Sequence, residues 1–395
     1  MRRLNIALLP IVLIITAAIL LFRTAEASTT SLPSIPKSCG GWGYVASPNV
    51  GTNSNFLYSI AAVSANNVWA VGEYGNGNGS STLVEQWNGK QWSVVASPNV
   101  NGATENTLAG VTAIAANDIW AVGSSTSANF VQRTLIEHWN GKRWSIVASP
   151  NVIALGNGLT AVSAVSAKDI WAVGNLSGPN GYQPLIEHWN GSQWRIVASS
   201  GVGMLNGVVA LASNNVWAVG SRASTNNIQT LIEHWNGSSW SIVASAGPGL
   251  ATNTLSAVAA ISANNVWAVG DSANIGSPHA PYSPLIEHWN GKVWSIIASP
   301  IQGTSDHIGG IAAVSASNIS VVGDYTSDID PAFGAYLTLI EHWDGTTWSI
   351  VNSPSPGAVA SDLVSAAAIP KTSKVWAAGF VQNDTAYQTL TEFYC

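Results

Sequence analysis

The third of a series of similar repeats reads "TAVSAVSAKDIWAVG" over residues 160–174 and "PLIEHWNGSQWRIVAS" over residues 184–199. It contains four short apolar segments, which are separated by a Lys-Asp turn, a variable loop and an Asn-Gly turn. Asn-Gly between two β-rich segments is the strongest short hairpin signal, because a two-residue type I′ turn needs positive φ at both central positions. The repeat therefore predicts four antiparallel β-strands.

This pattern occurs seven times along the chain at a nearly constant spacing. The second segment has a tryptophan in six copies, and in the other copy, "NISVVG", Ser320 replaces it. The third segment, "LIEHW" or a variant, has a glutamate in every copy, at positions 85, 137, 187, 233, 287, 341 and 392. Four-stranded repeats of this period are typical of propeller blades. We therefore expect an all-β chain that forms a seven-bladed β-propeller of four-stranded antiparallel blades.

The 19 tryptophans follow the same repeat. Six fall in the second strand, six in the third and seven in the fourth. Such regular placement predicts that they pack between blades and do not stack on a ligand. The first strand is rich in Ala, Ser and Gly instead, which suits the crowded position beside the axis.

The only two cysteines, Cys39 and Cys395, stand at the two ends of the repeat array. Third-strand and fourth-strand tryptophans are five positions apart, but the last repeat reads "FYC" where its fourth strand should follow. Laid end to end, Tyr394-Cys395 and Cys39-Gly40-Gly41-Trp42 reproduce the five-position spacing. We therefore expect the N-terminal strand to complete the last blade. A Cys39–Cys395 disulfide would close the ring, and two unrelated surface thiols are the alternative.

The N-terminal segment, residues 1–27, differs from the repeats. Two arginines precede an apolar run from Leu4 to Phe22, and Ala25 and Ala27 bracket a small-residue cleavage pattern. These features predict a signal peptide over residues 1–27, a linker over 28–38 and the propeller over 39–395. An uncleaved membrane anchor is the alternative, and only then would a membrane be a partner. We expect a secreted, extracellular protein, in a compartment where disulfides persist.

The composition limits the classes of binding partner that we expect. The chain is 47% hydrophobic and only 9% charged, so it can bury a large core. Of its 14 basic and 20 acidic residues, three arginines and one glutamate belong to the leader, which leaves 11 and 19, a net charge of −8. This charge excludes nucleic acid as an expected partner. We expect a monomer.

The repeats resemble those of exported bacterial β-propeller proteins with tryptophan-rich "WAVG" and "EHWNG" motifs, and are loosely similar to Asp-box and kelch-like propellers. The resemblance covers Cys39 to Cys395. It implies an architecture but no activity, because the chain lacks the Ser-x-Asp-x-Gly pattern of an Asp-box and the double glycine of kelch. No catalytic residue is carried over from sialidases or oxidases.

The repeated Glu-His pair is the most regular group of chemically active side chains. Histidine follows the glutamate in five repeats, as in Glu137-His138. Neighbouring strand residues point to opposite faces, so the two side chains cannot converge on one ligand. We therefore interpret them as hydrogen-bonding groups between blades. A Ser-His-Asp elbow, a phosphate-binding glycine loop and paired-Cys zinc spacing are all absent from the sequence.

Function is expected on one face of the ring. In an up-and-down blade the second-to-third loops and the links between blades emerge on the same side, which we call the variable-loop face. The second-to-third loop is longest in the fifth and sixth repeats, and acids outnumber bases on this face. The candidate ligand-binding residues are therefore Asp271, Asp306, His307, Asp324, Tyr325, Asp328 and Asp330.

These residues suit several ligands. Clustered carboxylates can hold Ca²⁺, although the spacing is not that of an EF-hand, and we expect no other cofactor. The acids could equally bind a sugar or a cationic ligand, with Tyr282, Tyr325 and Tyr336 as stacking partners. We favour a non-catalytic binding or scaffold propeller for a glycan or an extracellular protein. The alternative is a glycan-active hydrolase or lyase that uses carboxylates of repeats five to seven.

Overall fold

The structure is a computed structural model that describes residues 40–395, apart from residues 154, 180, 225–226, 250, 275–280, 327–334 and 384. The chain divides into two units, residues 1–32 and 33–395, and every described residue belongs to the second unit. The predicted signal peptide, the predicted linker and Cys39 lie outside the described residues. In the part that is described, no helix is long and apolar enough to cross a membrane.

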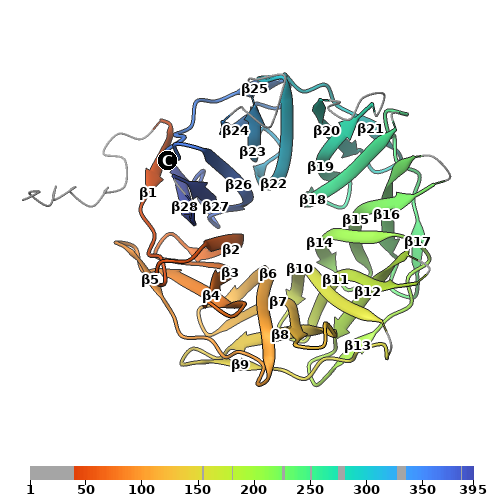
Figure 1. The fold of residues 1–395 in the computed structure, drawn as a ribbon. Helices are drawn as coiled ribbons and strands as arrows, with labels where there is room; N and C mark the ends of the chain where they lie inside the picture. Colours follow the sequence, from red (N-terminus) through yellow and green to blue (C-terminus); the bar gives the residue numbers. More distant parts are fainter. Residues whose placement is uncertain are drawn as a thin grey trace, which may run out of the picture. The chain divides into compact units, whose positions relative to one another are not determined.

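The described strands form a β-propeller (Figure 1), as the repeats predict. They fall into seven groups of four, here called blades 1 to 7, and each group is antiparallel. The strands of blades 1 to 3 are β2 (Asn55–Ser64), β3 (Asn67–Gly75), β4 (Ser80–Trp87), β5 (Trp92–Val94), β6 (Ala103–Ala115), β7 (Asp118–Ser127), β8 (Gln132–Trp139), β9 (Trp144–Ile146), β10 (Gly156–Ser166), β11 (Asp169–Gly178), β12 (Gly181–Trp189) and β13 (Trp194–Ile196).

The other four blades repeat this order. Blade 7 takes its outer strand from the N-terminal end of the described chain, so β1 belongs with β26 to β28. The strands of blades 4 to 7 are β14 (Met204–Ala212), β15 (Asn215–Ala223), β16 (Ile228–Trp235), β17 (Trp240–Ile242), β18 (Thr252–Ser262), β19 (Asn265–Ala273), β20 (Tyr282–Trp289), β21 (Trp294–Ile296), β22 (Ser305–Ser315), β23 (Asn318–Thr326), β24 (Tyr336–Trp343), β25 (Trp348–Ile350), β26 (Ala360–Ala368), β27 (Val375–Gln382), β28 (Tyr387–Tyr394) and β1 (Trp42–Val45).

The first strand of each blade lies beside the axis (Figure 1), which confirms the prediction from its small residues. All seven of these strands line a central cavity of about 230 Å³, from Ser59 of β2 to Ser365 of β26. Glycines permit close packing there: a Cβ on Gly310 of β22 would lie 2.7 Å from the Cα of Ser365.

The pairing of β1 with β28 closes the ring, as the sequence predicts. Trp42 lies opposite Tyr394 and Val45 lies opposite Thr391. The Gly40 N–H also donates to the Cys395 carbonyl oxygen at 2.9 Å. The disulfide itself stays a prediction, because it involves Cys39.

The Asn-Gly hairpins differ from the predicted two-residue type I′ turn. In blade 3, Trp189 pairs with Trp194, which leaves four residues between the strands. Gly191 has a φ of +90°, whereas Asn190 does not have positive φ. Instead, the Asn190 Oδ1 atom accepts hydrogen bonds from the Ser192 N–H at 3.0 Å and the Gln193 N–H at 3.1 Å. The asparagine therefore stabilises the turn through its side chain and not through left-handed backbone.

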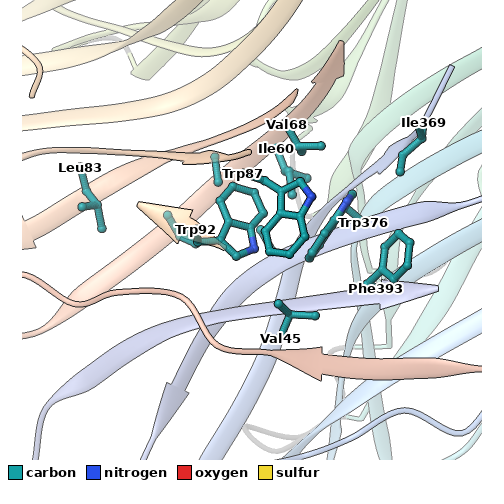
Figure 2. Packing of buried hydrophobic residues seen from close by; sticks show 12 residues of the cluster. Val45, Ile60, Val68, Leu83, Trp87, Trp92, Ile369, Trp376 and Phe393 are labelled. Carbon is teal, nitrogen blue, oxygen red and sulfur yellow. The ribbon is translucent and has the colours of Figure 1, made fainter. Parts of the chain in front are cut away.

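Tryptophans pack between blades, as predicted. The second-strand tryptophan of one blade contacts the third-strand and fourth-strand tryptophans of the next. Trp376 of blade 7, for example, lies 5.0 Å from Trp87 and 5.2 Å from Trp92 of blade 1, measured between ring centroids (Figure 2). The equivalent groups are Trp69-Trp139-Trp144, Trp120-Trp189-Trp194, Trp171-Trp235-Trp240, Trp217-Trp289-Trp294 and Trp267-Trp343-Trp348.

Candidate functional site

The seven repeat glutamates are structural. Their side chains are fully buried at 0% exposure, and several accept hydrogen bonds from a serine that follows the outer strand of the preceding blade. The Ser245 hydroxyl donates to Glu287 at 2.7 Å and also lies 2.6 Å from the Thr230 hydroxyl of its own blade. The same arrangement joins Ser149 to Glu187 at 2.8 Å. The predicted hydrogen bonding between blades is therefore confirmed for four of the glutamates, namely Glu187, Glu233, Glu287 and Glu341.

Burial raises the pKa of six of these carboxyl groups, because their charged form loses its hydration; the six belong to Glu85, Glu137, Glu187, Glu287, Glu341 and Glu392. The pKa is raised to about 8 for Glu137, Glu187 and Glu392, and to about 7 for Glu341. The serine hydrogen bonds to Glu187 and Glu341 act in the opposite direction and lower their pKa. Glu137, Glu187 and Glu392 are therefore mostly protonated at neutral pH.

The repeat histidines behave differently from the prediction, because they bond within their own blade. The His138 Nε2 atom lies 2.8 Å from Asp118 Oδ1, and its ring stacks on Trp120 with centroids 4.3 Å apart. Asp118 and Trp120 belong to the adjacent strand of blade 2. The histidine therefore supports the tryptophan that reaches into the next blade.

A pocket of about 360 Å³ opens between blades 6 and 7, and we call it the blade 6–7 pocket. Its residues lie near the strand ends on the variable-loop face. Blade 6 supplies one residue from each of its first three strands, and blade 7 supplies the rest. The lining residues are His307, Asp324, Tyr336, Ala360, Asp362, Phe380 and Tyr387.

Strand register places these side chains together. His307 of β22 pairs with Asp324 of β23, and Asp362 of β26 pairs with Phe380 of β27. Tyr336 forms a parallel bridge with Ala360, which links β24 of blade 6 directly to β26 of blade 7. The two walls of the pocket are thus held by main-chain pairing.

His307 connects the pocket to blade 5. Its Nδ1 atom lies 3.2 Å from Asp271 Oδ2, while Asp271 Oδ1 accepts the Ile308 N–H at 2.8 Å. The His307 ring also lies against Tyr282, with centroids 4.5 Å apart. Burial by itself would lower the pKa of His307, but the hydrogen bond to Asp271 and the nearby carboxylates raise it above the usual value. Asp271 therefore orients the imidazole and favours its protonated form.

The two carboxyl groups of the pocket titrate at different pH. Burial raises the pKa of Asp324 to about 6, although the charge of His307 lowers it. Burial, together with the charge of Asp324, raises the pKa of Asp362 to about 8. Perturbed carboxyl groups in a concave site are typical of functional sites.

An aromatic wall faces these charges. Phe380 and Tyr387 meet edge to face with centroids 5.5 Å apart. Phe56 of blade 1 supports both, at 5.2 Å from Phe380 and 4.9 Å from Tyr387. Tyr336 completes the aromatic lining from blade 6.

The predicted ligand-binding residues lie in different parts of the structure. His307 and Asp324 line the pocket and Asp271 binds His307, so three of them are brought together. Asp306 is fully buried and accepts the N–H groups of Gln302 and Gly303, so it fixes a link between blades. Tyr325 packs in the core between blades 5 and 6. Asp328 and Asp330 lie outside the described residues.

The candidate set missed Asp362, Phe380 and Tyr387. Aligning the repeats with one another could have identified Asp362. Leu363 of blade 7 and Ile308 of blade 6 both pair with the glycine of the second strand, so they are equivalent positions. Asp362 and His307 therefore occupy the same position in blades 7 and 6. Blades 1 and 2 have Phe56 and Thr107 there.

A metal site is not evident. Among the described residues, no group of three or more histidine, cysteine, aspartate or glutamate side chains is arranged to hold a metal ion. The calcium hypothesis depended on Asp328 and Asp330 as well as Asp324, so the structure does not test it.

The fold is similar to that of solved structures, although the sequence matches no protein-family model and no curated protein. The chain is similar to a structure described as YCF48 bound to D1 peptide, at 13% identity and a TM-score of 0.54, over 92% of this chain and 98% of that one. It is also similar to the GH74 enzyme of Niastella koreensis, at 14% identity and a TM-score of 0.53, over 89% of this chain and 55% of that one. At these identities the likeness shows the fold alone: this chain is a β-propeller.

Proposed function

We propose that this chain is an exported, non-catalytic binding propeller that recognises a glycan or an extracellular protein through the blade 6–7 pocket. One observation carries the proposal: the pocket brings together two carboxyl groups, an imidazole and three aromatic rings on the variable-loop face. Aromatic walls with a few converging polar groups are typical of ligand sites. Several of the regular glutamates, by contrast, accept hydrogen bonds from the preceding blade, and the regular histidines bond within their own blade.

The proposed mode of binding suits the fold. Blades are rigid, and their loop ends present side chains without requiring the scaffold to move. The YCF48 structure with its D1 peptide is an example of a propeller of similar fold that holds a peptide. Export directed by the segment 1–27 and closure by a Cys39–Cys395 disulfide remain part of the proposal.

Glycoside hydrolysis is the second candidate, and the two carboxyl groups favour it. Asp324 and Asp362 share one pocket but have pKa values of about 6 and about 8. Paired carboxyls with separated pKa values are what an acid and a base need in glycoside hydrolysis. Product analysis on any glycan that binds distinguishes this candidate from simple recognition.

The test uses the mature protein on glycan and peptide arrays. The pocket variant is the double substitution Tyr336→Ala and Tyr387→Ala, and the matched control is Tyr182→Ala. Tyr182 is 50% exposed and lies near the start of β12 on the same face, in blade 3. We expect the pocket variant to lose the binding that the wild type and the control retain. Unchanged binding by the pocket variant would place the ligand elsewhere.

A further inference from the structure

We infer that the blade 6–7 pocket takes an ammonium group, carried by a lysine side chain or by an amino sugar. This inference rests on the proposed function, because it names the chemical class of ligand for the same pocket. It follows from three properties of the pocket: carboxyl groups without hydrogen-bond donors, an excess of acids over bases, and an aromatic lining.

The first property concerns hydrogen bonding. Asp324 is only 9% exposed and lines the pocket, yet no described residue donates a hydrogen bond to it. Within the described residues, Asp362 also lacks a donor. Buried polar groups in proteins are almost always hydrogen-bonded, so the buried carboxyl group of Asp324 needs a donor from what fills the pocket, and the partly exposed Asp362 beside it offers a second acceptor. An ammonium group supplies three N–H donors and no acceptor.

The second property is the balance of charge. Three acids lie near enough to act on His307 through their charges, namely Asp271, Asp324 and Asp362. Asp306 adds a further negative charge near Asp324. The charges of neighbouring carboxylates raise the pKa of both pocket acids, after the larger effect of burial. A bound cation would relieve this repulsion, whereas a neutral sugar would not.

The third property is the lining itself. Tyr336, Phe380 and Tyr387 surround the carboxyl groups with aromatic surface. The face of an aromatic ring attracts a cation through its quadrupole, and this attraction grows when the site is shielded from water. Aromatic rings combined with carboxylates therefore favour an ammonium group over a hydroxyl group.

Binding of a cation must then compete with protons. Asp362 has a pKa of about 8, so it is largely protonated at pH 6 and must lose its proton to pair with the ligand. Asp324 has a pKa of about 6, so it is already ionised, and can pair with the ligand, at a lower pH than Asp362. A lysine amine keeps its charge throughout this range, since its pKa is about 10.4. We therefore expect the affinity for the lysine amine to rise between pH 6 and pH 8, by at most about tenfold per pH unit for each proton released.

The experiment uses two matched pairs of probes. Nα-acetyl-lysine amide is compared with its Nε-acetylated form, and glucosamine is compared with N-acetylglucosamine. Dissociation constants are measured by NMR titration of the mature protein. We expect the charged member of at least one pair to bind tenfold or more tightly than its acetylated partner. The pair that shows this difference identifies the source of the ammonium group.

Two variants and one control test whether the charged probe binds in the blade 6–7 pocket. Asp324→Asn and Asp362→Asn keep the side-chain shape and remove the charge, and each should weaken binding of the charged probe tenfold or more when binding is measured above pH 8, where both carboxyl groups are ionised. Glu105→Gln removes an exposed acid from the same face and should change nothing. Melting curves show whether each variant is folded, and a variant that does not fold is replaced by Tyr387→Leu.

The outcomes separate this inference from the proposed function. Equal or tighter binding of the acetylated probes overturns the ammonium inference, and so does charged-probe binding that survives both aspartate substitutions. The ammonium inference is also overturned if none of the four probes binds. When the ammonium inference fails, the array test decides the proposed function separately. The proposed function is supported if the Tyr336→Ala, Tyr387→Ala double variant loses binding to the ligand found on the arrays, and it fails if this variant still binds.

Discussion

Trp42 lies directly opposite Tyr394 in the pairing of β1 with β28, and their ring centroids are 5.7 Å apart. This pair occupies the position that two tryptophans hold in blade 3, where Trp189 lies opposite Trp194. The two ends of the described chain are therefore joined through side-chain packing as well as through main-chain hydrogen bonds.

Removal of this junction should destabilise the whole ring. Trp42→Ala is expected to lower the free energy of unfolding by about 3 kcal/mol, because large aromatic side chains lose their packing on truncation. Chemical denaturation followed by tryptophan fluorescence measures the change. Val359→Ala, at a 44% exposed position, is the control and should have little effect. A Trp42→Ala variant as stable as the wild type would show that β1 does not hold the ring.

The predicted disulfide should add to this stability. Closing a loop of this length is worth on the order of 5 kcal/mol in the chain-entropy model. A peptide map of the unreduced protein should recover Cys39 and Cys395 in one cross-linked fragment, and reduction should lower the midpoint of denaturation. Recovery of both cysteines as free thiols contradicts the prediction.

The interface between blades 6 and 7 should open before the others. Ser320 takes the place of the second-strand tryptophan there, so this interface lacks a three-tryptophan group among the described residues. Local opening depends on how much apolar packing an element has. In hydrogen exchange, amides of β23 and β26 should exchange faster than those of β11 and β14 around Trp171. Uniform exchange at all interfaces would contradict this expectation.

The buried glutamates should make the propeller more stable in acid than at alkaline pH. Their pKa is higher in the folded state, at about 7 to 8, than in the unfolded chain, at about 4.5. The unfolded state therefore loses protons more readily as the pH rises, and stability falls between about pH 4.5 and pH 8. Thermal melts across this range measure the trend.

A single substitution isolates this contribution. Glu187→Gln mimics the protonated carboxyl group, so it should reduce the pH slope by up to about 1.4 kcal/mol per pH unit while the protein stays stable at pH 5. Glu105→Gln, at an exposed position, should leave the slope unchanged. If Glu187→Gln leaves the slope as it is, the glutamate does not carry a proton in the folded state.

Asp271 should control the charge of His307. Its hydrogen bond and its negative charge both raise the pKa of the imidazole, so Asp271→Asn should lower that pKa. An NMR titration of the His307 ring protons measures the shift directly. The ring-proton signals of His138, which pairs with Asp118 in another blade, provide an internal control that the substitution should not change. An unchanged His307 titration would show that the contact with Asp271 is not made in solution.

The sequence predicts the blades well because a repeat places the same side chains at the same positions seven times. It fails at the Asn-Gly turn, since the number of residues in a hairpin depends on which residues pair, and only the Trp189–Trp194 pairing reveals four. The side-chain hydrogen bonds of Asn190 then remove the need for positive φ that the dipeptide suggests.

The pocket is only partly predictable, for a physical reason. Asp306 and His307 are neighbours in one strand and must point in opposite directions, but the register shift between Ile308 and Gly310 obscures which one faces the pocket. Asp362 and Phe380 come from another blade. Their position beside His307 depends on contacts across the blade interface, such as the Tyr336–Ala360 bridge, which no local pattern records.

The pairing of β1 with β28 also means that the chain could begin and end in another blade without changing the order of the blades around the ring. The Gly40 nitrogen and the Cys395 oxygen are within hydrogen-bonding distance, so a short peptide could connect these ends without moving either strand. A circular permutant joined there and opened between Asn190 and Gly191 would then have its new termini in blade 3, at a turn equivalent to the natural junction. It should fold to the same ring, with blade 3 rather than blade 7 assembled from the two ends of the chain.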